Sequence, residues 1–208
     1  VGLCDESVVR TIVSEGPERI QELIDYGVDF DHHEVDGEQV ISLGREGGHS
    51  VRRILHSRDT TGREIEKKLL AAARADPKIT LFEHHYAIDL ITTSKLGLAT
   101  ENRCVGIYAL DEKEGEVVNF RSDRVVLATG GSGKVYLYTS NPDVATGDGV
   151  AMAWRAGVEV ENMEFIQFHP TVLYHPKETS FLISEALRGE GGVLLGDDGE
   201  PFMSKYDE

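Results

Sequence analysis

The sequence predicts a mixed α/β fold with α+β character, and three observations support this. Apolar residues recur at helical spacing in two stretches, near residues 8–24 and 65–73. Strand-like segments at 79–92, 104–110 and 116–127, with a turn at 111–115, are typical of a β-meander. An apolar run, Val125–Ala128, leads directly into a glycine-containing loop, as a buried strand of an α/β sheet does.

The helical stretches predict three helices. The first carries an apolar face formed by Val8, Val9, Ile12 and Val13. Gly16-Pro17 is expected to stop it and to start a second helix, which ends at Gly27. A third helix is expected after Thr61–Glu64, which matches a capping box, and should end at Asp76-Pro77.

Shorter elements complete the expected architecture. Residues 39–43 are predicted to form a short strand, and residues 147–156 a short helix closed by Gly157. From Asn162 onward the sequence changes to loops and short strands rich in His, Phe and Pro. We therefore expect one domain over residues 1–161 and the start of another over 162–208.

Composition excludes several functional classes. The net charge of −16 repels nucleic acid and anionic membranes, so no partner of either kind is expected. No apolar run is long enough to span a bilayer, and the first residues show no leader-peptide pattern. With only two cysteines, we expect reduced thiols in a cytoplasmic protein and no metal site.

Two glycine-containing motifs are candidates for cofactor binding. The run that ends at Ala128 continues as Thr129, Gly130 and Gly131, where glycine lets the backbone approach a ligand. An ordinary strand-to-loop turn is the alternative; a P-loop is excluded because its Lys-Ser/Thr pair is missing. Thr146–Gly149 opens a helix, at which Asp148 either faces a ligand or is only an N-cap.

Two further motifs are candidates for substrate binding. His169 is followed by proline, is surrounded by aromatic residues and lies near the expected boundary, although a lone histidine is more often structural. Ser184 and Arg188 can each bind a carboxylate, and Glu185 can take or orient a proton. The alternative for this segment is a helix end with a Glu185–Arg188 charge pair.

These motifs, in this order, resemble the superfamily of succinate dehydrogenase, fumarate reductase and L-aspartate oxidase. Within it the sequence is most similar to the L-aspartate oxidases, on three strings: 45–50 (REGGHS), 139–143 (TSNPD) and 173–176 (LYHP). The resemblance implies a partial Rossmann-like FAD-binding domain with a β-meander over 1–161 and the start of an α+β capping domain over 162–208.

The resemblance also implies roles for individual residues. His169 matches a histidine that binds a substrate carboxylate, Ser184 and Glu185 match a threonine–glutamate pair, and Glu46 matches a glutamate that recognises the substrate ammonium. Non-covalent FAD is expected to contact seven positions: Tyr86, Ala87, Ala128, Thr129, Gly130, Gly131 and Asp148. His169 and Ser184 are expected to converge on one cleft.

The implied activity is oxidation of L-aspartate to iminoaspartate for NAD biosynthesis, with oxygen or fumarate reoxidising the flavin and quinolinate synthase taking the product. A flavoprotein subunit of fumarate reductase or succinate dehydrogenase is the alternative. The GxGxxG fingerprint and the catalytic arginine of the superfamily are absent from these 208 residues. The chain is therefore expected to be an internal fragment that is by itself nearly free of FAD and inactive.

Overall fold

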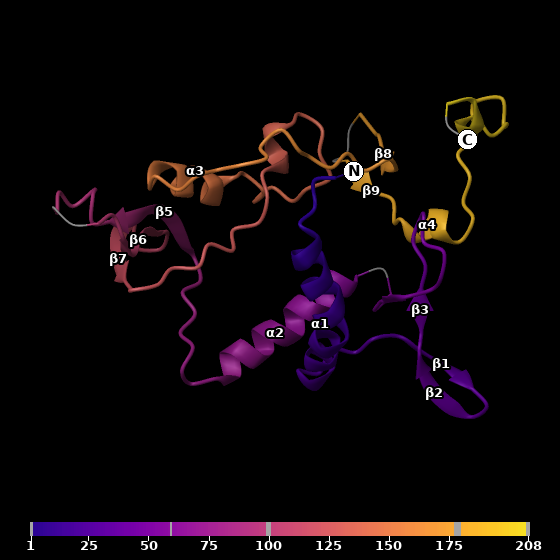
Figure 1. Ribbon diagram of the computed structural model, residues 1–208, viewed down its shortest axis with the longest axis horizontal. Coiled ribbons are helices and arrows are strands. Elements are labelled where there is room, and N and C mark those ends of the chain that lie inside the picture. The colour runs from indigo at the N-terminus through magenta and orange to yellow at the C-terminus, as the bar shows by residue number, and fades with distance from the viewer. Residues whose placement is uncertain (1, 59, 99–100, 177–179, 207–208) are drawn as a thin grey trace. The chain divides into compact units, whose positions relative to one another are not determined.

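The computed structural model describes residues 2–58, 60–98, 101–176 and 180–206, and Figure 1 traces their path. They form two compact units, one made of residues up to Leu81 together with those from Ser184 onward, the other of Phe82–Ile183. We call these unit 1 and unit 2. The predicted mixture of helices and strands is confirmed, and none of the described helices has the length and apolarity needed to cross a membrane.

Helix α1 (Glu6–Asp25) opens unit 1 as one continuous helix, so the two helices predicted here were wrong. Asp5 caps it, accepting hydrogen bonds from the backbone N–H groups of Ser7 and Val8. Pro17 removes one backbone donor, but the steric conflict before a proline involves the Cβ of the preceding residue. That residue is Gly16, which has no Cβ, and this relieves part of the conflict. The helix continues to Asp25, and Gly27 follows in the predicted C′ position with a φ of +87°.

Helix α2 (Thr61–Ala75) ends at Asp76 as predicted, but the capping box predicted for its start is wrong. Thr60 occupies the N-cap position and its side chain caps no backbone amide. The Thr61 hydroxyl instead accepts a hydrogen bond from the Ser57 N–H at 3.1 Å. Thr61 is thus the first helical residue, and its side chain faces back to the preceding loop.

The strands of unit 1 are short. Antiparallel pairs join β1 (His32–Val35) to β2 (Glu38–Ile41) and β3 (Leu43–Gly44) to β4 (Ile54–Leu55). The single strand predicted at 39–43 is divided at Ser42, whose N–H donates to the Asp31 carbonyl rather than to a strand. Helix α4 (Ala186–Gly189) and the 3-10 turn η2 (Met203–Lys205) belong to the C-terminal part of this unit.

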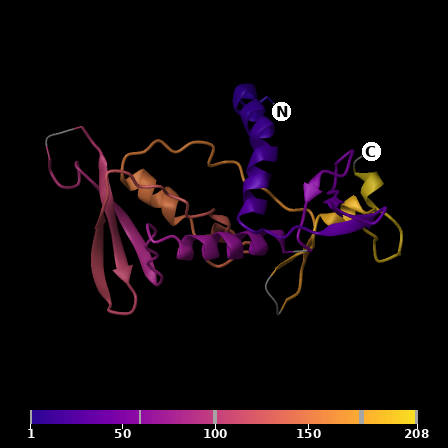
Figure 2. The ribbon, with the colours of Figure 1, turned by 90° about the horizontal axis from the view of Figure 1, so that it is seen from below.

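Unit 2 is built on the predicted β-meander. Strands β5 (His85–Thr92), β6 (Cys104–Asp111) and β7 (Glu116–Arg121) pair antiparallel in that order, and Figure 2 shows the three side by side. The sheet is shorter than predicted at both ends. Residues 79–84 precede β5 without strand structure, and β7 ends at Arg121 instead of continuing to 127.

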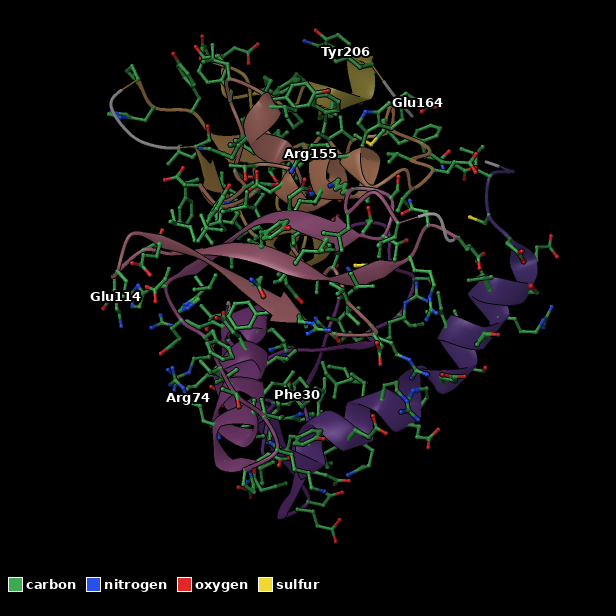
Figure 3. All side chains as sticks on the ribbon, turned by 90° about the vertical axis from the view of Figure 1, so that its left-hand side faces the viewer. Phe30, Arg74, Glu114, Arg155, Glu164 and Tyr206 are labelled. Atoms are coloured by element: carbon green, nitrogen blue, oxygen red, sulfur yellow. The ribbon has the colours of Figure 1, made fainter. Side chains whose placement is uncertain are left out.

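Helix α3 (Asp148–Arg155) confirms the short helix predicted before Gly157, and it packs on β5. Met152 is 1% exposed and, with Leu90 and Ala109, belongs to the core of the unit. Arg155, labelled in Figure 3, binds both the Asp89 carboxylate and the Ile88 carbonyl on β5. The helix is therefore fixed to the sheet by apolar burial and by polar contacts at its C-terminal end.

The buried strand predicted at Val125–Ala128 is not formed. Val126 is 88% exposed, and no described strand pairs with this segment. A strand buried on both faces needs neighbours that satisfy its backbone amides and carbonyls, and the described residues offer none here. The glycine-containing loop that follows is nevertheless part of unit 2.

The remaining elements of unit 2 surround a cavity. The 3-10 turn η1 (Gly133–Val135) begins a loop that returns to α3, and a two-stranded hairpin pairs β8 (Val172–Leu173) with β9 (Phe181–Leu182). The domain boundary expected between residues 161 and 162 separates two domains of the superfamily. The compact units have other bounds and do not test this boundary, which stays a prediction.

Candidate functional site

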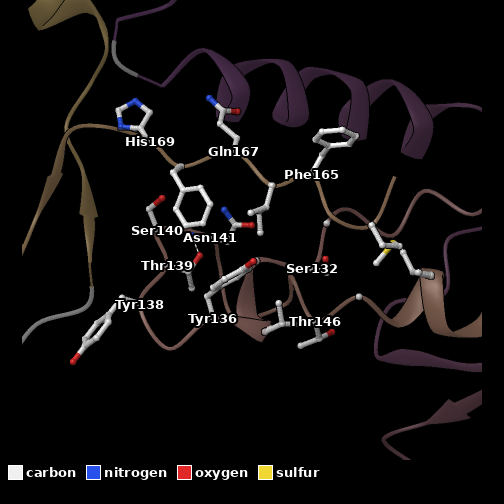
Figure 4. A pocket seen from close by; sticks show the side chains of 18 of the residues that line it. Ser132, Tyr136, Tyr138, Thr139, Ser140, Asn141, Thr146, Phe165, Gln167 and His169 are labelled. Carbon is white, nitrogen blue, oxygen red and sulfur yellow. Dashed lines mark hydrogen bonds between the residues drawn. The ribbon is translucent and has the colours of Figure 1, made fainter. Parts of the chain in front are cut away.

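A cavity of about 1240 Å³ lies within unit 2, and Figure 4 shows many of the side chains around it. The loop from Gly131 to Asn141 faces the segment from Asn162 to His169 across it, with α3 contributing Trp154. Two residues predicted from separate motifs, Gly131 and His169, line this one cavity. It can receive a large, partly aromatic ligand, because most of its lining side chains are apolar or aromatic.

The glycines near this cavity serve close packing. Gly147 donates its N–H to the Gly131 carbonyl at 3.2 Å, which closes the loop between them. A Cβ on Gly149 would collide with the Thr129 hydroxyl, so glycine is required for this approach. A Cβ on Gly131, in contrast, would meet no atom within 4 Å, which leaves its backbone accessible from the cavity.

Asp148 is not the N-cap of α3, because Gly147 occupies that position in a left-handed conformation. The Asp148 carboxylate accepts hydrogen bonds from the Tyr86 hydroxyl at 2.7 Å and from Thr146 at 2.9 Å. The Tyr86 bond is the main cause that lowers the pKa of Asp148, and the same bond raises the pKa of Tyr86. Two predicted flavin contacts, from β5 and from α3, thus meet directly.

The other predicted flavin positions do not line the cavity. Ala87 is half-buried in β5, opposite Ala109. Ala128 and Gly130 are exposed, and Gly130 has a φ of +73° that favours glycine. Of the seven predicted positions Gly131 alone is in the described lining, and the roles of the others stay predictions.

His169 is half-buried on the cavity wall and is oriented by Thr171. The backbone N–H of Thr171 lies 3.3 Å from Nδ1 of the histidine, and Thr171 is itself only 8% exposed. Nδ1 also lies 3.1 Å from the Thr171 carbonyl oxygen, to which a protonated Nδ1 donates. In the other tautomer Nδ1 accepts from the Thr171 N–H, the ring proton is on Nε2, and Nε2 becomes a donor. A neutral His169 in that tautomer can donate to a ligand carboxylate.

Aromatic residues form much of the wall, and among them the sequence analysis did not single out Tyr136, Tyr138 and Trp154. The Tyr136 ring meets Phe168, next to His169, at a centroid distance of 5.8 Å, and Tyr138 meets Tyr174 at 6.2 Å. The first pair joins the loop after η1 to the segment that carries His169, and the second joins the same loop to the residue after β8. The only tryptophan of the sequence, Trp154, lines the same cavity. The clustering of tyrosines at 136 and 138 was the available signal.

In unit 1, the candidates Ser184 and Glu185 lie on one turn. The Ser184 hydroxyl accepts a hydrogen bond from the Ala186 N–H at 3.3 Å, which leaves its own proton available. Glu185 and Arg188 form an ion pair of 2.5 Å one helical turn apart, so the charge pair named as the alternative is present. Arg188 Nε is buried with no hydrogen-bond partner in the described residues.

The loop that carries Glu46 packs on this turn. A Cβ on Gly47 would lie 3.4 Å from the nearer Glu185 carboxylate oxygen, and one on Gly189 would lie 2.9 Å from the Glu46 Cα. His49 closes the loop by donating its N–H to the Glu46 carbonyl at 3.1 Å. Glu46 and Glu185, predicted from distant parts of the sequence, therefore belong to one cluster in unit 1.

These candidates thus fall into two groups. Glu46, Ser184 and Glu185 belong to unit 1, whereas His169 and the expected flavin contacts belong to unit 2. The convergence of His169 and Ser184 on one cleft accordingly stays a prediction.

The lining of the cavity suits FAD. Open backbone at Gly131 allows a phosphate or ring to approach closely, while Trp154 and Tyr136 offer flat apolar surfaces. The volume of about 1240 Å³ exceeds that of usual drug-sized ligands, which occupy pockets of about 300–1,000 Å³. Gly131, Gly147 and Trp154 are the residues that would hold such a group.

Comparisons with known proteins agree with this chemistry. The family described as FAD binding domain matches residues 1–208. The chain is 57% identical to L-aspartate oxidase 1 of Ralstonia nicotianae and 53% identical to the chloroplastic L-aspartate oxidase of Arabidopsis thaliana, covering 100% and 99% of this chain. It spans 38% and 32% of those relatives, respectively.

A solved structure gives the same result for the fold. A mutant quinol fumarate reductase of E. coli superposes with a TM-score of 0.84 at 33% sequence identity. The match covers 95% of this chain and 32% of that one.

Proposed function

Because the chain belongs to the family of FAD-binding domains, we propose that it forms part of an enzyme that oxidises L-aspartate to iminoaspartate. The observation that carries the proposal is the single cavity lined by both Gly131 and His169. An accessible glycine backbone and a histidine donor are what a flavin and a carboxylate substrate require at one site. The L-aspartate oxidases among its relatives support this choice of substrate.

FAD, when bound non-covalently, supplies the acceptor for the hydride that leaves the substrate Cα. The chain's own residues bind and orient the substrate. His169 holds one carboxylate through Nε2–H, with its ring fixed by Thr171. Two fixed contacts on a small dicarboxylate restrict its rotation, and this restriction accelerates a reaction at the carbon between them.

The cluster in unit 1 recognises the groups that distinguish aspartate. The Ser184 hydroxyl donates to a carboxylate, while the Glu46 carboxylate pairs with the substrate ammonium. Glu185, held by Arg188, orients a proton. A plain dicarboxylate such as succinate or fumarate lacks the ammonium group, so only amino substrates use Glu46.

The proposal extends to the surroundings of the reaction. Iminoaspartate hydrolyses readily in water, so an enzyme that consumes it should act next. We propose that this enzyme is quinolinate synthase, in NAD biosynthesis, and that both enzymes are cytoplasmic. Fumarate or oxygen reoxidises the flavin. No nucleic acid or membrane takes part.

A second function is favoured by one observation, the structural likeness to a quinol fumarate reductase. In that case the chain belongs to the flavoprotein subunit of a fumarate reductase or succinate dehydrogenase. The unit 2 cavity would then serve a dicarboxylate without an amino group, and Glu46 would have no charged partner in the substrate.

A substrate panel on the complete protein separates the two functions. We expect flavin bleaching with L-aspartate under anaerobic conditions and reoxidation by either oxygen or fumarate. Bleaching by succinate, with none by L-aspartate, would establish the second function instead. A protein purified without flavin absorbance, and unable to bind added FAD, would contradict both.

A further inference from the structure

Two segments of unit 1 that are far apart in the sequence are held together by one guanidinium group. Nε and Nη2 of Arg45 donate to the Gly189 carbonyl at 3.1 and 2.7 Å, across 144 positions of sequence. Gly189 is buried, and a Cβ there would collide with the Arg45 carbonyl. The contact therefore needs both the arginine side chain and the glycine.

The two segments carry different parts of the proposed substrate site. Arg45 is adjacent to Glu46, and Gly189 ends the helix that begins just after Ser184 and Glu185. The Glu46 Cα lies so close to Gly189 that a Cβ on this glycine would be 2.9 Å away. The guanidinium contact thus fixes the distance between the Glu46 loop and the Ser184–Glu185 turn.

A second contact joins the same two segments but holds them together less strongly. Arg52 and Glu190 form an ion pair of 2.7 Å, with both side chains 54% exposed. Exposed ion pairs contribute little because water and salt screen them. A charged donor bound twice to one carbonyl is the stronger contact, since such charge-assisted hydrogen bonds exceed neutral ones.

We propose that Arg45 is a positioning residue for amine recognition: by binding the Gly189 carbonyl it presents the Glu46 carboxylate to an amino-dicarboxylate substrate. This inference rests on the proposed oxidation of L-aspartate. The residue touches no substrate itself. It acts mainly through Glu46, so its loss should affect amino substrates much more strongly than plain dicarboxylates.

The test compares Arg45→Met with Arg45→Lys in the complete protein. Arg45→Met removes both donors and should raise the KM for L-aspartate about tenfold or more, the usual effect of losing a charge-assisted hydrogen bond. Its FAD content should stay unchanged, and its fumarate reduction should fall much less than its oxidation of L-aspartate. Arg45→Lys keeps one charged donor and should recover part of the loss.

Arg53→Met is the matched control. It removes the same charge from the same loop, and the Arg53 side chain makes no hydrogen bond or ion pair in the described part of the chain. Its KM for L-aspartate should equal that of the wild type. An equal rise in both variants would show an effect of net charge alone and would overturn the proposal.

A double variant and an activity-free measurement complete the design. In a Glu46→Gln background, Arg45→Met should have no further effect on L-aspartate, because the group it positions is already neutral. Amide hydrogen exchange should increase in peptides 45–52 and 186–191 of Arg45→Met. Unchanged hydrogen exchange, or equal losses of activity on L-aspartate and fumarate, would overturn the proposal for Arg45. A wild-type protein that is inactive on L-aspartate would instead overturn the proposed function.

Discussion

Among single residues, the contact between Tyr86 and Asp148 joins β5 to the first turn of α3. The tyrosine hydroxyl donates to the carboxylate at 2.7 Å and, with Thr146, lowers the pKa of Asp148. A carboxyl whose folded pKa is depressed favours the folded arrangement above its unfolded pKa, and this advantage is lost as pH falls through the folded pKa. The contact therefore weakens only in acid.

Replacing Tyr86 by phenylalanine should raise the pKa of Asp148 toward its ordinary value of about 3.9. If Asp148 contacts FAD as the resemblance predicts, the variant should lose FAD at a higher pH than the wild type does. Dialysis of the complete protein over a pH series, followed by flavin absorbance, measures this. Tyr206→Phe, at an 80% exposed tyrosine, is the control, and superimposable profiles for wild type and Tyr86→Phe would refute the assignment.

Glu46 should separate amino-dicarboxylates from plain ones. Glu46→Gln keeps the size of the side chain but removes its charge, so kcat/KM for L-aspartate should fall about 100-fold, as expected when one partner of a desolvated ion pair is lost. Fumarate reduction should be largely unchanged. Steady-state kinetics with both substrates checks this, and parallel losses would indicate that Glu46 is structural.

At the scale of elements, Asp89 connects α3 to the meander. Its carboxylate binds Lys95 at 2.6 Å and Arg155 at 3.3 Å, and its side chain is 23% exposed. Burial alone would raise the pKa of Asp89, but the hydrogen bonds from Lys95 and Leu90 and the charge of Arg155 outweigh it and lower the pKa. This residue is thus ionised when α3 packs on β5.

Asp89→Asn should lower stability by about 2 kcal/mol at pH 7, since it removes a charged acceptor from two cations. Because the folded pKa is depressed, the difference should shrink as pH falls below about 4, the ordinary aspartate value. Thermal unfolding of the complete protein at pH 7 and pH 3.5 measures the change. A difference that is independent of pH would argue against an electrostatic cause.

Gly149 decides how closely α3 approaches the glycine-containing loop. Alanine normally stabilises a helix interior, but here its Cβ would collide with the Thr129 hydroxyl. Gly149→Ala should therefore destabilise by about 1–2 kcal/mol, the usual effect of overpacking. Gly62→Ala in α2, with no atom within 4 Å, should be neutral or stabilising, and thermal midpoints that shift alike would contradict this account.

For the molecule as a whole, the site of FAD can be tested through Trp154, the only tryptophan of these 208 residues and part of the cavity lining. FAD bound in this cavity should quench its emission, because the flavin absorbs in the same range at close distance. The difference in emission between the complete protein and its Trp154→Phe variant should be large without FAD and small with it. A difference that FAD does not change would exclude the cavity as the flavin site.

The sequence alone determined the elements whose contacts are local. The β-meander, the helix over 148–155 and the helix ends at Gly27 and Asp76 were predictable, because alternation, helical spacing and capping residues act over a few positions. The family could be predicted from four short strings for a related reason. Each string has its residue types at a fixed spacing, so it can be recognised in the sequence before the fold is known.

Only the tertiary structure decided where local signals met distant partners. Val125–Ala128 stays out of strand structure because no described strand pairs with it. The contact of Arg45 with Gly189 spans 144 positions. Every residue has a backbone carbonyl, so the sequence does not show which carbonyl a distant arginine binds. That choice depends on the path of the chain through space.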